Sequence, residues 1–115
     1  MADKVIHFEV LGRDQAALQK FYGDLFGWTF NTDNPDGYGI APGDQAGVAV
    51  GIGNARDGSA GHVTGYVAVK DIDAALADAE RLGGRIVMPK MSPGPNAVIA
   101  LVADPEGHVV GLTQL

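Results

Sequence analysis

His7 and Glu9 are the two residues of this chain whose types and spacing are best suited to chemistry. They lie two positions apart in the run Val5-Ile6-His7-Phe8-Glu9-Val10. A β-strand places alternate side chains on opposite faces, so a strand over residues 4–11 would hold His7 and Glu9 on one face. The opposite face is apolar, and we expect it to pack on a helix through Ile6, Phe8 and Val10.

More than one role is open for each of these side chains. The pKa of histidine lies near working pH, so His7 could act as a general base, or it could be an inert, hydrogen-bonded residue of a pocket. Glu9 could act together with His7 or hold a cationic ligand. It could equally form a salt bridge with a neighbouring strand. The pair therefore indicates either proton transfer or polar recognition.

Three hydroxyl side chains are further candidates for orienting a ligand. Thr64 and Tyr66 alternate in the apolar run over residues 62–69, which places both on one face of a strand. Tyr38 supplies a third hydroxyl just after a turn at residues 34–37. We predict a substrate-binding set of five residues, in which His7 is also the candidate catalytic residue: His7, Glu9, Tyr38, Thr64 and Tyr66.

The elements that would position these residues recur along the chain. Ala-Ala-Leu triplets and helix-ending glycines return at an offset of about 56–58 residues, long enough for a supersecondary unit. Each half is predicted to hold a strand, a helix and short strands, with a polar, glycine-rich linker over residues 54–61. The predicted strands cover residues 4–11, 28–30, 38–40 and 46–52, then 62–69, 85–88, 97–103 and 108–113.

Two helices are predicted from their ends and their apolar periodicity. Asp14 and Asp71 are of the type that caps a helix N-terminus, and the glycines at 27 and at 83–84 are typical of helix ends. Apolar residues at three- and four-residue spacing form two stripes, Leu18, Phe21, Tyr22 and Leu25 in the first helix and Ile72, Leu76, Ala79 and Leu82 in the second. Trp28 is interpreted as a packing residue, and three prolines within residues 89–96 predict a loop.

Composition excludes several classes of partner. The 115 residues fit one domain over 1–115, with modules at about 1–56 and 60–115. Cysteine is absent, which excludes disulfides and thiolate metal sites. A formal net charge of -6 disfavours nucleic acid and anionic membrane surfaces as partners. No apolar run reaches the length of a membrane span and no signal peptide is visible, so we expect a cytoplasmic protein.

The order of these elements resembles the vicinal oxygen chelate superfamily, also called glyoxalase/bleomycin-resistance/dioxygenase proteins. The ending Gly111-Leu112-Thr113-Gln114 is similar to a lactoylglutathione-lyase-related branch of unassigned activity. The resemblance implies an α+β fold in which two βαβββ modules form a half-open mixed-sheet barrel around a pocket. The other matching phrases are Val5-Ile6-His7-Phe8-Glu9-Val10, Phe21-Tyr22, Phe26-Gly27-Trp28, Val69-Lys70-Asp71-Ile72-Asp73-Ala74-Ala75, Leu82-Gly83-Gly84 and Asp104-Pro105-Glu106-Gly107-His108.

Many members of that superfamily hold a divalent metal ion with one residue from each of four strands. His7 matches the first position, whereas the other three fall on Val50 or Gly51, on Thr64 and on Gly111. One imidazole cannot hold a divalent ion against water, so we expect neither a metal nor another cofactor. The alternative is a shifted site made of His7, Glu9 and His62. Without it, His62 is interpreted as a solvent-exposed strand start.

Three functions follow from this reading. The leading expectation is a small-molecule-binding protein, acting by sequestration or in a metal-free lyase or isomerase step. The second is a metal-dependent lyase of the lactoylglutathione-lyase type that uses the shifted site, and the third is a structural or partner-binding module. The resemblance and the open strand edges both favour a homodimer. His108 is interpreted as structural or exposed.

Overall fold

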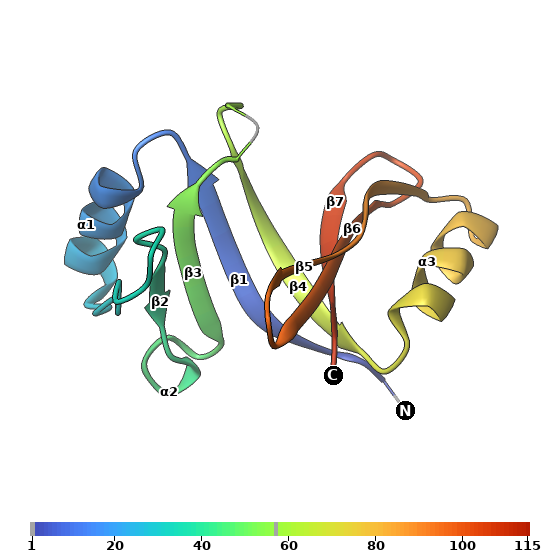
Figure 1. Cartoon of the computed structure of the whole chain (residues 1–115), viewed down its shortest axis with the longest axis horizontal. Helices are drawn as coiled ribbons and strands as arrows, with labels where there is room; N and C mark the ends of the chain where they lie inside the picture. The colour runs from blue at the N-terminus through green and yellow to red at the C-terminus, as the bar shows by residue number, and fades with distance from the viewer. Residues whose placement is uncertain (1, 57) are drawn as a thin grey trace. The chain divides into compact units, whose positions relative to one another are not determined.

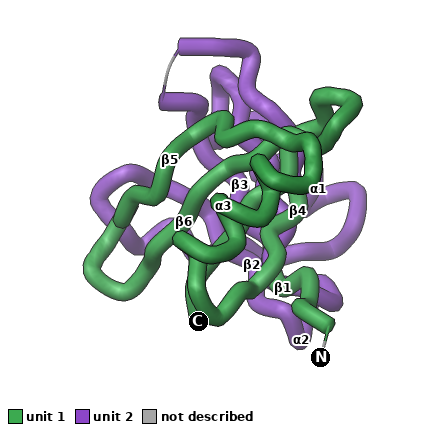
Figure 2. The backbone as a smooth tube through the Cα atoms, turned by 90° about the vertical axis from the view of Figure 1, so that its right-hand side faces the viewer, with its two compact units in different colours: residues 1–6, 65–115 green, residues 7–64 purple. Residues whose placement is uncertain are grey.

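The computed structural model describes residues 2–56 and 58–115 of the chain. They form two compact units: unit 1 comprises residues 2–6 and 65–115, and unit 2 comprises residues 7–56 and 58–64 (Figure 2). Residues 2–6 thus belong with the second half of the chain, and the predicted linker belongs with the first half. Asp57, within that linker, lies outside the described residues.

Unit 2 is a small sheet with one helix packed against it. It contains β1 (Lys4–Gly12) from His7 onward, α1 (Gln15–Phe26), β2 (Gly39–Ala41), the short α2 (Gly43–Ala46), β3 (Ala49–Asn54) and the first three residues of β4 (His62–Val69) (Figure 1). β3 is the central partner, because it pairs in parallel with β1 and antiparallel with β2. In the parallel pair, Glu9 lies opposite Gly51.

Helix α1 begins and ends at the predicted residues. The Asp14 carboxylate accepts a hydrogen bond from the Ala17 N–H at 3.1 Å, and Gly27 ends the helix with a φ of 76°. Leu18 and Tyr22 pack on the core of unit 2 with Phe8, Trp28 and Phe30, over the buried residues Val10, Ala41, Val50 and Ile52. The predicted stripe is wrong at Phe21 and Leu25, which are 58% and 59% exposed.

The apolar face of β1 is confirmed in part. Val10 is buried and Phe8 packs against the core of unit 2, as the alternation of the strand predicts. Ile6 differs, because it belongs to unit 1 and is 41% exposed.

Unit 1 is the βαβββ module predicted for the second half. Its elements are β4 from Gly65 onward, α3 (Ile72–Arg81), β5 (Arg85–Gly94), β6 (Ala97–Ala103) and β7 (Val109–Gln114), with the strands in the order β4-β7-β6-β5. The Asp71 carboxylate caps α3 by accepting from the Ala74 N–H at 3.1 Å. One face of α3 packs on the sheet (Figure 1), and the core residues are Val69, Ile72, Leu76, Ala100 and Leu112.

Three predicted segments are wrong. Residues 28–30 form no strand, and only Asn31 makes an isolated bridge to Ile40. The strand predicted over 46–52 begins at Ala49, after the short helix α2. Residues 89–94 are strand rather than loop, because β5 is an edge strand with register shifts, where proline is tolerated. Leu82, the last residue of the second predicted stripe, is exposed at the end of α3.

The α+β prediction is confirmed. The described residues contribute seven strands to a mixed arrangement that is not closed, with parallel pairs β1·β3 and β4·β7 and antiparallel pairs β2·β3, β5·β6 and β6·β7. Within residues 2–56 and 58–115, every helix is too short or too polar to cross a membrane.

Candidate functional site

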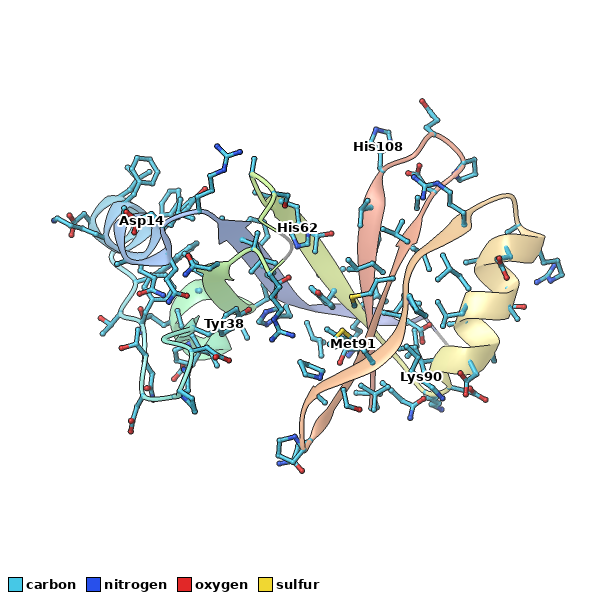
Figure 3. The ribbon with its side chains drawn as sticks, turned by 45° about the horizontal axis from the view of Figure 1, so that its top comes forward. Asp14, Tyr38, His62, Lys90, Met91 and His108 are labelled. Carbon is cyan, nitrogen blue, oxygen red and sulfur yellow. The ribbon has the colours of Figure 1, made fainter. Side chains whose placement is uncertain are left out.

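Four side chains of unit 2 form one hydrogen-bonded series, which we call the polar cluster: His7, Glu9, Tyr38 and His62. His7 and Glu9 come from the face of β1 opposite Phe8 and Val10. Tyr38 directly precedes β2, and His62 is the first residue of β4 (Figure 3). Residues that are up to 53 positions apart in sequence are therefore joined on one sheet face.

The cluster runs in the order His7, Tyr38, Glu9, His62. The Tyr38 hydroxyl donates to Glu9 Oε2 at 3.0 Å and lies 3.2 Å from His7 Nε2. Since a phenol has one proton to donate, its oxygen accepts from His7, and this assignment places the His7 proton on Nε2. Glu9 Oε1 lies 3.1 Å from His62 Nε2. The side chains of Glu9 and His62 are 14% and 30% exposed.

Burial sets the protonation of His7. Loss of hydration lowers the pKa of His7 below its ordinary value of 6.5, although the nearby Glu9 carboxylate opposes the shift. His7 is consequently neutral at pH 7. A neutral imidazole can both donate and accept a proton, whereas an imidazolium can only donate.

The lowered pKa of His7 predicts a loss of stability on acidification. Because the unfolded chain takes up this proton first, His7 favours the folded state above pH 6.5 and this contribution falls as pH drops from 6.5 toward the folded pKa. One proton limits the slope to about 1.4 kcal/mol per pH unit. Urea unfolding at pH 5.5 and 7.5 should show a smaller difference for His7→Gln than for the parent chain.

The exposed pair of His108 and Asp104 in unit 1 provides the control for that experiment. Hydrogen bonds from His108 lower the pKa of Asp104 below its ordinary value of 3.8. Protonation of this carboxylate therefore changes the stability only at a pH well below 5.5. His108→Gln should therefore keep the pH dependence of the parent chain between pH 5.5 and 7.5. An unchanged pH dependence in His7→Gln would contradict the assignment of the effect to His7.

The backbone and the ring of Tyr38 are both held in place. The Asn34 side chain accepts from the Tyr38 N–H at 3.0 Å and donates to the Tyr38 carbonyl at 2.7 Å. The ring lies over Gly51 and Gly53 of β3, where an added Cβ would come within 1.7 Å and 2.5 Å of Tyr38 atoms. Glycine at both positions therefore leaves the space in which the ring sits.

Of the five predicted binding residues, the structure brings His7, Glu9 and Tyr38 together. Thr64 lies in the same unit on β4 and is buried. Tyr66 belongs to unit 1, where it is also buried and its ring packs against Gly111 of β7. The roles of all five residues in ligand binding, and that of His7 in catalysis, stay predictions.

His62 is the member of the cluster that the sequence analysis placed beside His7 and Glu9 only in the alternative, shifted metal site. It was interpreted as a solvent-exposed strand start, and this is wrong, because its Nε2 lies 3.1 Å from Glu9 Oε1. Its parity with Thr64 was the available signal, since residues 62 and 64 share a strand face. The interpretation of His108 is confirmed: its side chain is 73% exposed, and its Nδ1 lies 3.0 Å from Asp104 Oδ2.

The residues at the ligand positions implied by the superfamily resemblance do not fit a metal site. Gly51 and Gly111, at two of the ligand positions, each lie against a tyrosine ring, and Thr64 offers only a hydroxyl. The shifted arrangement of His7, Glu9 and His62 has the Tyr38 hydroxyl between two of its donors. In the described part of the chain, no group of three or more His, Asp or Glu side chains is arranged to hold a metal ion.

An apolar groove lies elsewhere in unit 2. It has a volume of about 450 Å³ and lies beside the first turns of α1, lined by residues that include Val10, Leu18 and Phe21. No member of the polar cluster lines it. The groove and the polar cluster are therefore separate features, and the candidate catalytic residue His7 belongs to the polar cluster.

Comparison with known proteins identifies relatives of the whole chain. Residues 7–113 match the family model of the glyoxalase-like domain. The chain is 35% identical over 109 residues to CFP32 of Mycobacterium bovis and of Mycobacterium tuberculosis, which is named as a candidate glyoxylase. That match covers 88% of this chain and 41% of CFP32, so the chain spans about two fifths of the length of these curated relatives.

Solved structures show the same fold at low identity. A glyoxalase/bleomycin resistance protein/dioxygenase superfamily member from Vibrio splendidus 12B01 has a TM-score of 0.66 and 19% identity, covering 99% of this chain and 100% of that chain. Hypothetical protein BH1468 from Bacillus halodurans C-125 has a TM-score of 0.69 and 15% identity, covering 100% and 96%. Methylmalonyl-CoA epimerase from Mycobacterium tuberculosis has a TM-score of 0.63 and 17% identity, covering 96% and 86%. The fold implied by the sequence resemblance is confirmed.

Proposed function

Because the chain belongs to the glyoxalase-like domain family, we propose that it binds a small organic molecule at the polar cluster of unit 2, without a metal ion. The observation that carries this proposal is the series His7–Tyr38–Glu9–His62, whose hydrogen bonds measure 3.0–3.2 Å. Such a series presents imidazole, phenol and carboxylate groups on one sheet face. Convergent polar groups of this kind fix a ligand's orientation in binding sites.

The chemistry of the cluster suits a compact ligand with hydrogen-bonding groups. The neutral His7 can exchange a proton with such a ligand, and the Tyr38–Glu9 pair supports that exchange. We propose sequestration of the ligand or a metal-free lyase or isomerase step. The net charge of -6 disfavours a strongly anionic ligand such as a coenzyme A thioester.

The remaining proposals concern assembly and location. We propose that the chain forms a homodimer, acts in the cytoplasm and binds neither nucleic acid nor membranes. The charge argues against polyanionic partners, and the open edge at the short strand β2 favours pairing of two copies. The chain is further proposed to act as one domain over residues 1–115.

Native mass spectrometry of protein purified without chelator tests ligand, metal and subunit number together. We expect about twice the chain mass of 11.9 kDa, and far less than one ion per chain after incubation with Zn²⁺, Ni²⁺, Mn²⁺ or Fe²⁺. In ligand-observed NMR with a fragment library of small carboxylates, amines and amides, His7→Ala should lose the fragments that bind the parent chain. Loss of one neutral hydrogen bond, at about 1 kcal/mol, corresponds to roughly a 5-fold weaker affinity.

His108→Ala is the matched control, because it removes an exposed histidine outside the cluster and should retain every fragment. Stoichiometric metal on the parent chain that is lost in His7→Ala would overturn the metal-free proposal and favour the metal-dependent lyase. Fragments that bind equally to the parent chain, His7→Ala and His108→Ala would place the binding site outside the polar cluster. A chain that stays at 11.9 kDa at high concentration would contradict the homodimer.

A further inference from the structure

We infer that the Tyr38 hydroxyl occupies the point where a metal ion bridging His7 and Glu9 would lie, so that Tyr38 is the residue that excludes metal from unit 2. This inference rests on the proposed metal-free function and adds the residue responsible for it.

The first argument is the position of the hydroxyl. Its oxygen lies 3.2 Å from His7 Nε2 and 3.0 Å from Glu9 Oε2. An ion such as zinc takes imidazole nitrogen and carboxylate oxygen ligands at about 2.0–2.2 Å, so it too must lie between the two donors. The phenol oxygen and an ion therefore compete for the same small space. His62, on the other oxygen of Glu9 at 3.1 Å, is a third nearby donor.

The second argument is the glycine at position 51, which lies against the Tyr38 ring. Glu9 lies opposite Gly51 in the parallel β1·β3 pair, so a side chain at position 51 would project beside Glu9. A Cβ on Gly51 would lie 1.7 Å from the Tyr38 hydroxyl oxygen and 2.3 Å from its Cζ. A carboxylate at position 51 and the ring of Tyr38 therefore exclude each other.

The third argument is that the ring is held rather than loosely placed. Asn34 bonds both the N–H and the carbonyl of Tyr38, at 3.0 Å and 2.7 Å. A Cβ on Gly53 would also meet the ring, at 2.5 Å from Cδ1. Tyr38 is fixed at its backbone, along its ring and at its hydroxyl.

Unit 1, taken by itself, repeats this pairing of tyrosine with glycine. Gly111 lies opposite Tyr66 in the parallel β4·β7 pair, and a Cβ on Gly111 would lie 2.5 Å from the Tyr66 ring. Gly111 is the position in the last strand of the second half that corresponds to Gly51 in the first. In both units, the side chain that the resemblance would place there is absent and a tyrosine ring takes its space.

The test is to remove the ring and restore the carboxylate. Tyr38→Ala/Gly51→Glu would present four donors, namely His7, Glu9, His62 and the introduced carboxylate, and four is the number that zinc commonly takes. With Zn²⁺ as the probe in calorimetry at pH 7.5, we expect about one ion per chain, with a Kd at least 100-fold lower than that of the parent chain. Adding His7→Ala should remove the gain.

Two control variants isolate the ring. Tyr38→Phe/Gly51→Glu adds the carboxylate but keeps the ring, which itself lies within 2.7 Å of a Cβ at position 51, and Gly51→Glu alone keeps both ring and hydroxyl. Both should stay at least 10-fold weaker than the double variant. Circular dichroism establishes that each variant folds, and Tyr38→Ser/Gly51→Asp replaces the double variant if that one does not. A folded double variant, in either form, that binds Zn²⁺ no better than the parent chain overturns the inference. Failure of the proposed function has a different signature, which is zinc bound stoichiometrically by the parent chain itself.

Discussion

Replacing Phe8 by alanine is expected to lower the free energy of unfolding by roughly 3 kcal/mol, at the lower end of the range for phenylalanine truncation in cores. Phe8 packs against the core of unit 2, which contains Val10, Val50 and Ile52. Removing the ring leaves space that a close-packed sheet and helix refill only in part. We expect a value at the lower end of that range because the Phe8 side chain is only half-buried. Urea and thermal unfolding measure the loss.

His7→Ala is the matched comparison, since His7 precedes Phe8 and projects from the other face of β1. It removes one hydrogen bond to Tyr38 and should cost roughly 1 kcal/mol. The two variants should therefore differ in both measurements. Phe8→Ala should lose stability and keep fragment binding, whereas His7→Ala should keep most of its stability and lose fragment binding. A chain that unfolds with His7→Ala and tolerates Phe8→Ala would show that the faces of β1 are assigned backwards.

Gly111→Ala is expected to lower the free energy of unfolding by about 1–3 kcal/mol, the range for overpacking a well-packed core. The new Cβ would lie 2.5 Å from Cδ2 and Cε2 of Tyr66. These atoms belong to the body of a ring that is 5% exposed, so the ring cannot move aside into solvent. Position 111 itself is fixed by β-pairing on both sides, to Tyr66 in β4 and to Leu101 in β6.

A double-mutant cycle checks the cause of that loss. In a Tyr66→Ala background the space above position 111 is open, so Gly111→Ala should cost less than 0.5 kcal/mol, on the order expected for a substitution without a clash. Thermal unfolding of the four chains gives the coupling energy. Additive losses would mean that the methyl group acts through the strand backbone and not through Tyr66.

Local signals in the sequence were sufficient for the helices and for most strands. Asp14 and Asp71 cap their helices with their own side chains, and Gly27 adopts the left-handed conformation that ends α1. Such contacts join residues a few positions apart, so composition and spacing reveal them. The alternation of His7 with Phe8 also predicted correctly which side chain enters the core.

The misses depend on pairing between distant strands. His62 meets Glu9 across 53 residues. Strand alternation places His62 on the face of Thr64, but the sequence does not determine which residue of β1 it contacts. The contact of the Tyr38 ring with Gly51 and Gly53 likewise cannot be predicted without knowing that β3 lies beneath the ring. The prolines within residues 89–96 predict a loop, because proline lacks an N–H donor. Only the position of β5 at the edge of the sheet explains why residues 89–94 form a strand.

That edge has a consequence for how copies of the chain can meet. Pro89 and Pro93 lie in β5, and each leaves a gap in the row of backbone donors that an incoming strand would need. The register shifts along β5 interrupt the remaining row further. This margin of the molecule is therefore protected against strand-by-strand growth into fibrils. Two copies would have to associate through side-chain surfaces or through the edge at β2, which is only three residues long.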